Sequence, residues 1–188
     1  MRFYVPPFHD HTTQTRAFRQ AFAKFGQVIR QAECDYWDTL RPLLPPPVAQ
    51  LMGAHLHDAY IDILRWDGES KELALRLTEC GDNPGFFCLN LLYHGVTMAS
   101  QQEETLSQVA QEPSAQIAFH EIDILQGDAP LVFVQRTLWN TNVERGRKGH
   151  MIDTWKPETQ WQFTGLEIEA VPWQEPYPAP VRQITGLP

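Results

Sequence analysis

The spacing of the apolar residues changes near Leu56. Before this point apolar residues recur every three or four positions, which is typical of a helix. After it they recur at every second position over much of the chain, which is typical of strands. A chain of 188 residues has the length of one domain. The change of period therefore predicts a single α+β domain in which a helical segment precedes a sheet.

The helical segment carries one broad apolar stripe. Thr12 or Thr13 can cap a helix that runs to about Tyr36, and a short second helix is expected at Val48–Ala54, after a run of three prolines. Because a stripe of phenylalanines needs an apolar surface to cover it, we expect an amphipathic N-terminal helix packed on one face of the sheet. The stripe comprises Phe18, Ala21, Phe22, Phe25, Val28, Ile29, Ala32 and Tyr36.

The second part of the chain predicts a mainly antiparallel sheet of about six strands. Its clearest strand has Leu73, Leu75 and Leu77 on one face and polar residues between them, and the preceding Asp67-Gly68 is a hairpin turn signal. The connections are mostly too short for parallel crossovers, so neighbouring strands should run antiparallel. The stretch Gln101–Pro113 is expected to form either a short amphipathic helix or a loop.

Two changes of phase interrupt the alternation in later strands. Ile117 and Phe119 alternate in one phase and Ile122 in the other, so we expect a β-bulge near His120-Glu121. The last strand, Trp161–Val171, changes phase at Gly165.

Three ranges are expected to differ in organisation. Residues 1–57 form the helical segment, 58–171 form the sheet in one domain with the helix, and 172–188 form a proline-rich tail. The tail should be extended or disordered, or lie on the body through Trp173 and Tyr177.

Charge and cysteine content narrow the classes of protein. The formal net charge of −8 disfavours nonspecific nucleic-acid binding and favours a basic partner. The three cysteines form no C-x-x-C pair, so we expect reduced, mostly buried thiols in a cytoplasmic protein. The start has no signal-peptide pattern and no apolar run is long enough to cross a membrane, so no membrane association is expected.

His55, His57 and Asp58 form the one cluster that suggests metal chemistry. If the segment is extended, the two imidazoles point to the same side and could chelate a divalent ion. The pair is similar to the start of the metal motif of cupins, but the expected glutamate is missing, and Phe87 and Cys88 stand where a second motif would need histidine. The alternative is that His57 and Asp58 form a turn into the first strand.

Four more residues are candidates for binding. Glu121 and Asp123 point the same way if the bulge precedes them, which would suit acid–base chemistry, although the solvated face of a sheet is the preferred interpretation. Trp139 and Trp155 lie near strand ends, where they either contribute to an interface or close the core. No residue is assigned a catalytic role.

A succession of short motifs resembles a known type of domain. It comprises Leu56-His57-Asp58-Ala59, Leu73-Ala74-Leu75-Arg76-Leu77, Phe119-His120-Glu121-Ile122 and Leu166-Glu167-Ile168. The arrangement resembles uncharacterised small bacterial α+β domains with a Leu-His-Asp-Ala strand start, which are related in type to immunity proteins of polymorphic-toxin loci. The resemblance covers Leu56 to Val171 and implies no catalytic residues.

The sequence thus predicts a noncatalytic domain that binds another protein and needs no cofactor. Immunity-type neutralisation of a basic toxin is one concrete version, because an acidic protein associates quickly with a basic one. The alternative is a small-molecule or metal-binding protein, or an enzyme, that uses His55, His57 and Asp58.

Overall fold

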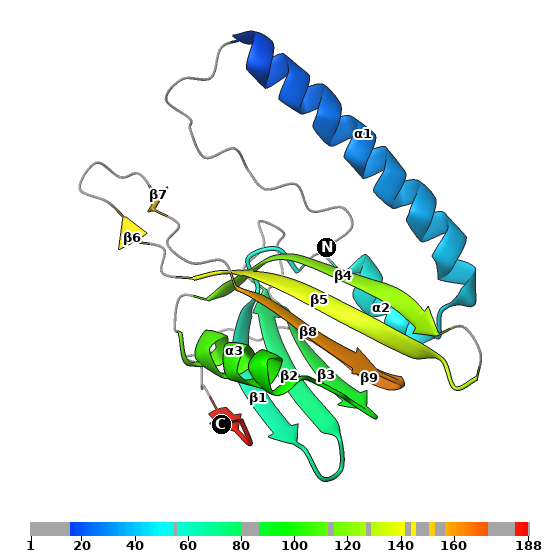
Figure 1. The fold of residues 1–188 in the computed structure, drawn as a ribbon, viewed down its shortest axis with the longest axis vertical. Coiled ribbons are helices and arrows are strands. Elements are labelled where there is room, and N and C mark those ends of the chain that lie inside the picture. The colour runs from blue at the N-terminus through cyan, green and yellow to red at the C-terminus, as the bar shows by residue number, and fades with distance from the viewer. Residues whose placement is uncertain are drawn as a thin grey trace. The chain divides into compact units, whose positions relative to one another are not determined.

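The computed structural model describes residues 16–54, 56–79, 87–112, 115–126, 129–141, 144–145, 151–152, 157–172 and 183–187. The chain forms two compact units, Met1–Ala49 and Gln50–Pro188. Helices and a large antiparallel sheet make up the fold, which confirms the α+β class (Figure 1). No helix among the described residues is both long enough and apolar enough to span a membrane.

The first unit contains the long helix α1, Arg16–Leu40, and a 3₁₀ turn at Arg41–Leu43. α1 ends four residues later than the sequence predicts, and its predicted start at Thr12 or Thr13 lies outside the described residues. Val28, a member of the predicted apolar stripe, is 64% exposed. The packing of α1 on the sheet stays a prediction. The short helix α2, Pro46–Gly53, begins two residues before its predicted start, since a proline is well suited to the first helical position.

The main sheet has eight strands rather than six. Its order is β8-β5-β4-β1-β2-β3-β9, with all neighbours antiparallel, and β10 pairs with β1 in parallel. The additional strands arise because the predicted last strand is split in two and the tail contributes one. The strands are β1 Tyr60–Asp67, β2 Glu72–Glu79, β3 Phe87–His94, β4 Gln116–Gln126, β5 Val132–Asn140, β8 Glu158–Phe163, β9 Gly165–Pro172 and β10 Gln183–Thr185, and a separate pair is formed by β6 Glu144–Arg145 and β7 Met151–Ile152.

The predicted last strand is divided at Thr164 into β8 and β9, which lie at the two ends of the strand order. β8 pairs with β5 and β9 pairs with β3, so the chain passes from one end of the order to the other within one residue. Figure 1 shows β8 running directly into β9. The expected phase change at Gly165 is therefore confirmed, and its consequence is a strongly bent sheet.

Helix α3, Ser100–Gln111, confirms the helical alternative for the stretch after β3. It buries Leu106, Val109 and Ala110. The Gln102 side chain accepts a hydrogen bond from the Gln160 backbone N–H at 2.7 Å. Because β8 is at the end of the strand order, this contact covers part of an edge that would otherwise be open.

The core lies on the side of the sheet that carries Leu73, Leu75 and Leu77, which are 0–4% exposed. The Tyr93 ring packs edge-on against Trp161 and Phe163, with centroids 5.6 and 5.1 Å away. Burial raises the pKa of the Tyr93 hydroxyl far above its usual range, so the group stays a neutral donor.

The bulges lie elsewhere than predicted. β4 shifts register between Ile117 and Phe119 and again between Ile124 and Gln126, not at His120-Glu121. A further bulge in β1, between Ile61 and Ile63, turns Ile63 away from the core. Periodicity locates a change of phase only to within a few residues, because either neighbour can be the extra one.

Candidate functional site

The outer face of β1, β2, β3 and β9, opposite the leucines of the core, is hollowed. The hollow has a volume of about 500 Å³. Its apolar part includes Ile63, Ala74 and Leu92, which are half-buried. Its polar part, which we call the charged rim, consists of Arg65, Arg76, Asn90, Glu167 and Glu169.

The two signs of charge occupy opposite sides of the hollow. Arg65 and Arg76 come from the neighbouring strands β1 and β2, whereas Glu167 and Glu169 come from β9. In the strand order β2 is two strand spacings from β9, roughly 10 Å, and β1 is three, roughly 14 Å. A partner group with both charges would match this arrangement.

A row of hydrogen bonds crosses the hollow. Arg76 Nε donates to Asn90 Oδ1 at 2.8 Å, and Asn90 Nδ2 donates to Glu169 Oε2 at 2.9 Å. These residues are aligned because Arg76 pairs with Asn90, and Asn90 with Glu169, in the registers of the two ladders. The row fixes the positions of these three side chains before any ligand binds.

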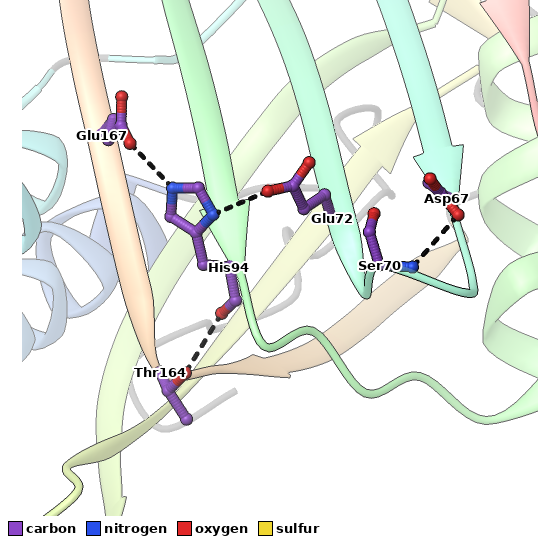
Figure 2. Close-up of polar contacts among 6 residues, drawn as sticks. All are labelled: Asp67, Ser70, Glu72, His94, Thr164 and Glu167. Atoms are coloured by element: carbon purple, nitrogen blue, oxygen red, sulfur yellow. Dashed lines mark hydrogen bonds and ion pairs between the residues drawn. The ribbon is translucent and has the colours of Figure 1, made fainter.

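His94 connects three strands at one end of this face. Its Nε2 lies 2.9 Å from Glu167 Oε1 and its Nδ1 lies 3.1 Å from Glu72 Oε1, as Figure 2 shows. Each ring nitrogen therefore faces a carboxylate oxygen, one from β9 and one from β2. The ring thereby orients Glu167, whose side chain is 72% exposed and lines the hollow.

Thr164 secures the backbone beside His94. Its N–H and its hydroxyl both donate to the carbonyl oxygen of His94, at 3.0 and 3.3 Å (Figure 2). Gly95 follows with φ +62°, and an added Cβ there would lie 2.3 Å from Thr164 Oγ1. The corner that places Glu167 therefore needs glycine at this position.

The β1–β2 turn next to this end is held by Asp67. Its Oδ1 accepts a hydrogen bond from the backbone N–H of Ser70 at 3.2 Å (Figure 2). It also accepts one from the backbone N–H of Glu69 at 2.9 Å. The bond from Ser70 is the main reason that the pKa of Asp67 is lower than its usual value.

The predicted metal cluster is only partly within the described residues, since His55 lies outside them. His57 Nδ1 is 3.0 Å from Asp58 Oδ2, and both side chains are half-exposed. The two residues form a turn before β1, in which Asp58 has φ +68° and donates its backbone N–H to Ile117. No group of three His, Cys, Asp or Glu residues that could hold a metal ion occurs in the described part of the chain.

Glu121 and Asp123 lie on β4, after the first of its bulges. Glu121 is not solvated as preferred, because its side chain is only 11% exposed and lies 3.2 Å from the Arg136 guanidinium. Asp123 Oδ1 accepts a hydrogen bond from the next backbone N–H. Glu121 is thus held in an ion pair with Arg136 on the neighbouring strand.

Trp139 is 1% exposed and donates its indole N–H to Thr159 Oγ1 at 2.9 Å. This burial agrees with the interpretation that it closes the core. Trp155 and Cys80 lie outside the described residues. Cys88 is half-buried, whereas Cys34 is exposed, which contradicts the expectation of mostly buried thiols.

None of the residues of the charged rim was predicted from the sequence to belong to a binding site. A partial signal was present, since strict alternation in β2 places Arg76 opposite the leucine face. The alignment of Arg76, Asn90 and Glu169 could not be predicted from the sequence, because it depends on the pairing of β3 with β9, which are far apart in the chain.

The chain matches no protein-family model, and neither a curated protein nor a solved structure is significantly similar to it.

Proposed function

We propose that this chain is a noncatalytic protein-binding domain and that the hollow on the outer face of β1, β2, β3 and β9 is its binding surface. The observation that carries the proposal is the charged rim around an apolar floor, with basic side chains on one side and acidic ones on the other. Apolar contact with a few placed polar groups is the usual composition of a specific binding site.

The chemistry of the lining favours binding over catalysis. The described lining residues are aliphatic side chains, two arginines, an asparagine and two glutamates. Asn90 and Glu169 are already used in the hydrogen-bonded row, and Glu167 is bonded to His94. These groups supply shape and charge but no nucleophile.

Immunity-type neutralisation of a basic toxin is the concrete version that we propose. The net charge of −8 would steer a basic partner toward the chain, and Glu167 presents an exposed carboxylate at the rim. The resemblance of the Leu56–Val171 region to immunity-type domains supports the same version.

The test is co-expression with the protein encoded next to this chain's gene, followed by kinetic measurement of their association. We expect the association rate to fall about tenfold or more between about 50 and 500 mM salt, because screening removes the steering. An association rate that does not change with salt would contradict the electrostatic version.

A matched pair of variants tests the location. Glu169→Lys changes a rim residue, whereas Glu104→Lys makes the same charge change on an exposed position of α3. We expect Glu169→Lys to raise the dissociation rate at least tenfold and Glu104→Lys to change mainly the association rate. Equal effects of the two variants would show that the hollow is not the contact surface.

The alternative, a metal-binding site at His55, His57 and Asp58, has the exposed His57–Asp58 contact in its favour. It is tested by metal analysis of tag-free protein and by thermal shifts with zinc, manganese and nickel. We expect no stoichiometric metal and no shift. A bound ion that is lost in His57→Ala would favour the alternative.

A further inference from the structure

One edge of β1 is only partly used by the rest of the sheet. Along its other edge β1 pairs with β2 from Tyr60 to Asp67. On this edge β4 pairs with β1 at one position, Tyr60 with Gln116, supported by backbone hydrogen bonds of Ile117 to Asp58 and Ala59. Beyond Tyr60 β4 diverges from β1, so the rest of this edge of β1 is not paired with β4 and leaves an opening for another strand.

β10 occupies this opening. It runs parallel to β1, and its residues Gln183, Ile184 and Thr185 pair with Ile63, Leu64 and Arg65. Figure 1 shows the short red strand at the C-terminal end lying beside β1. Only Ile184 is half-buried, and its two neighbours are exposed.

Gly186 fits the end of the opening closely. Its φ is +83°, and a Cβ added there would lie 1.7 Å from the carbonyl oxygen of Trp66. The backbone of Trp66 cannot move far enough to make room for a Cβ atom, so only glycine fits at position 186. The opening therefore holds an extended segment in which Ile184 is followed two residues later by a required glycine.

We propose that this edge of β1 is a strand-binding groove, that β10 occupies it in cis, and that the partner inserts an extended Ile-x-Gly segment in its place. The inference rests on the proposed protein-binding function and names the partner segment. Recognition by strand addition draws affinity from main-chain hydrogen bonds and specificity from alternate side chains.

The groove and the hollow are continuous. Ile63 and Arg65 line the hollow and also pair with Gln183 and Thr185. A partner strand in the groove would therefore place its neighbouring residues beside the charged rim.

The size of β10 makes exchange feasible. It has three residues, two of them exposed, and an element with so few buried contacts has low local stability. A partner present at sufficient concentration can compete with such a segment, because the two share one set of hydrogen bonds.

The test uses a fluorescent peptide of residues 182–188, Arg-Gln-Ile-Thr-Gly-Leu-Pro, and full-length chains as receptors. Gly186→Ala should release β10, so we expect this variant to bind the peptide at least tenfold more tightly than the wild type, measured by anisotropy. Gly53→Ala is the matched control, since nothing lies within 4 Å of its added Cβ, and it should behave as the wild type. A peptide with Gly186→Ala should bind to none of the three receptors, which are the wild type, Gly186→Ala and Gly53→Ala.

Hydrogen exchange completes the test. In Gly186→Ala, the β1 amides near Ile63 and Arg65 should lose protection and regain it when the peptide is added. Equal peptide binding by the wild type and the variant, or no binding to a variant whose β1 edge is exposed, would overturn the proposal. If Gly186→Ala does not fold, Ile184→Asp takes its place with the same criteria.

The two proposals fail in different ways. If Glu169→Lys leaves partner binding unchanged while the peptide still binds Gly186→Ala, the hollow is not the contact surface and the groove remains. If the partner depends on the rim but the peptide binds nowhere, the groove proposal is wrong and the hollow remains.

Discussion

At the scale of single residues, the buried hydroxyl of Tyr93 shows how polar atoms are held in this core. Tyr93 is 0% exposed and its O–H donates to Gln135 Oε1 at 2.7 Å. Tyr93→Phe would leave the amide oxygen without this donor, so we expect the free energy of unfolding in urea to fall by about 1–3 kcal/mol. Tyr93→Phe with Gln135→Met removes both partners and should recover part of the loss. A double variant that loses the sum of both single effects would contradict this explanation.

At the scale of elements, the β1–β2 turn should respond to pH through Asp67. The folded state lowers the pKa of Asp67, so its contribution to stability is present at neutral pH and is lost as the pH falls through that lowered value. Asp67→Asn keeps the acceptor oxygen but cannot ionise. We expect the thermal midpoint of the wild type to exceed that of Asp67→Asn at about pH 5, and the difference to shrink toward about pH 2. A difference that is constant over this range would show that the charge of Asp67 does not stabilise the turn.

At the scale of the second unit, the corner at Gly95 and Thr164 connects the two ends of the strand order. Gly95→Ala forces a left-handed conformation on alanine, which costs about 1–2 kcal/mol, and it pushes its Cβ into Thr164. We expect a lower thermal midpoint and faster hydrogen exchange in both β8 and β9. Gly165→Ala is the neighbouring control, because its Cβ would make ordinary contacts with His94, at 3.4 Å or more. Similar midpoints for the two variants would show that the corner does not couple the strands.

Local pattern predicted most of the elements. Alternation located β2 and β3, and the spacing of apolar residues located α1, because both signals arise from neighbours within one element. The same reasoning left Gln101–Pro113 open, and burial of Leu106, Val109 and Ala110 in the folded chain decided it as a helix.

The surroundings of two other predicted features, Glu121 and the tail, could not be predicted from local pattern for a related reason. Glu121 was predicted as solvated, but its exposure depends on Arg136, which the pairing of β4 with β5 places opposite it. The tail was predicted to be extended or disordered, or to lie on the body through Trp173 and Tyr177, which are outside the described residues. Its described part, β10, is extended, and its pairing with β1 depends on β4 leaving β1 after Tyr60.

By itself the sequence determined the class of this protein: a helical segment followed by an antiparallel sheet whose leucine face is buried. Its periodicities report which side of an element is apolar, and that property belongs to each element separately. The tertiary structure alone decided the strand order, the joining of its ends at Thr164, the charged rim and the place of β10. All of these depend on contacts between residues distant in the chain, whose formation is governed by the packing of the whole sheet rather than by any one segment.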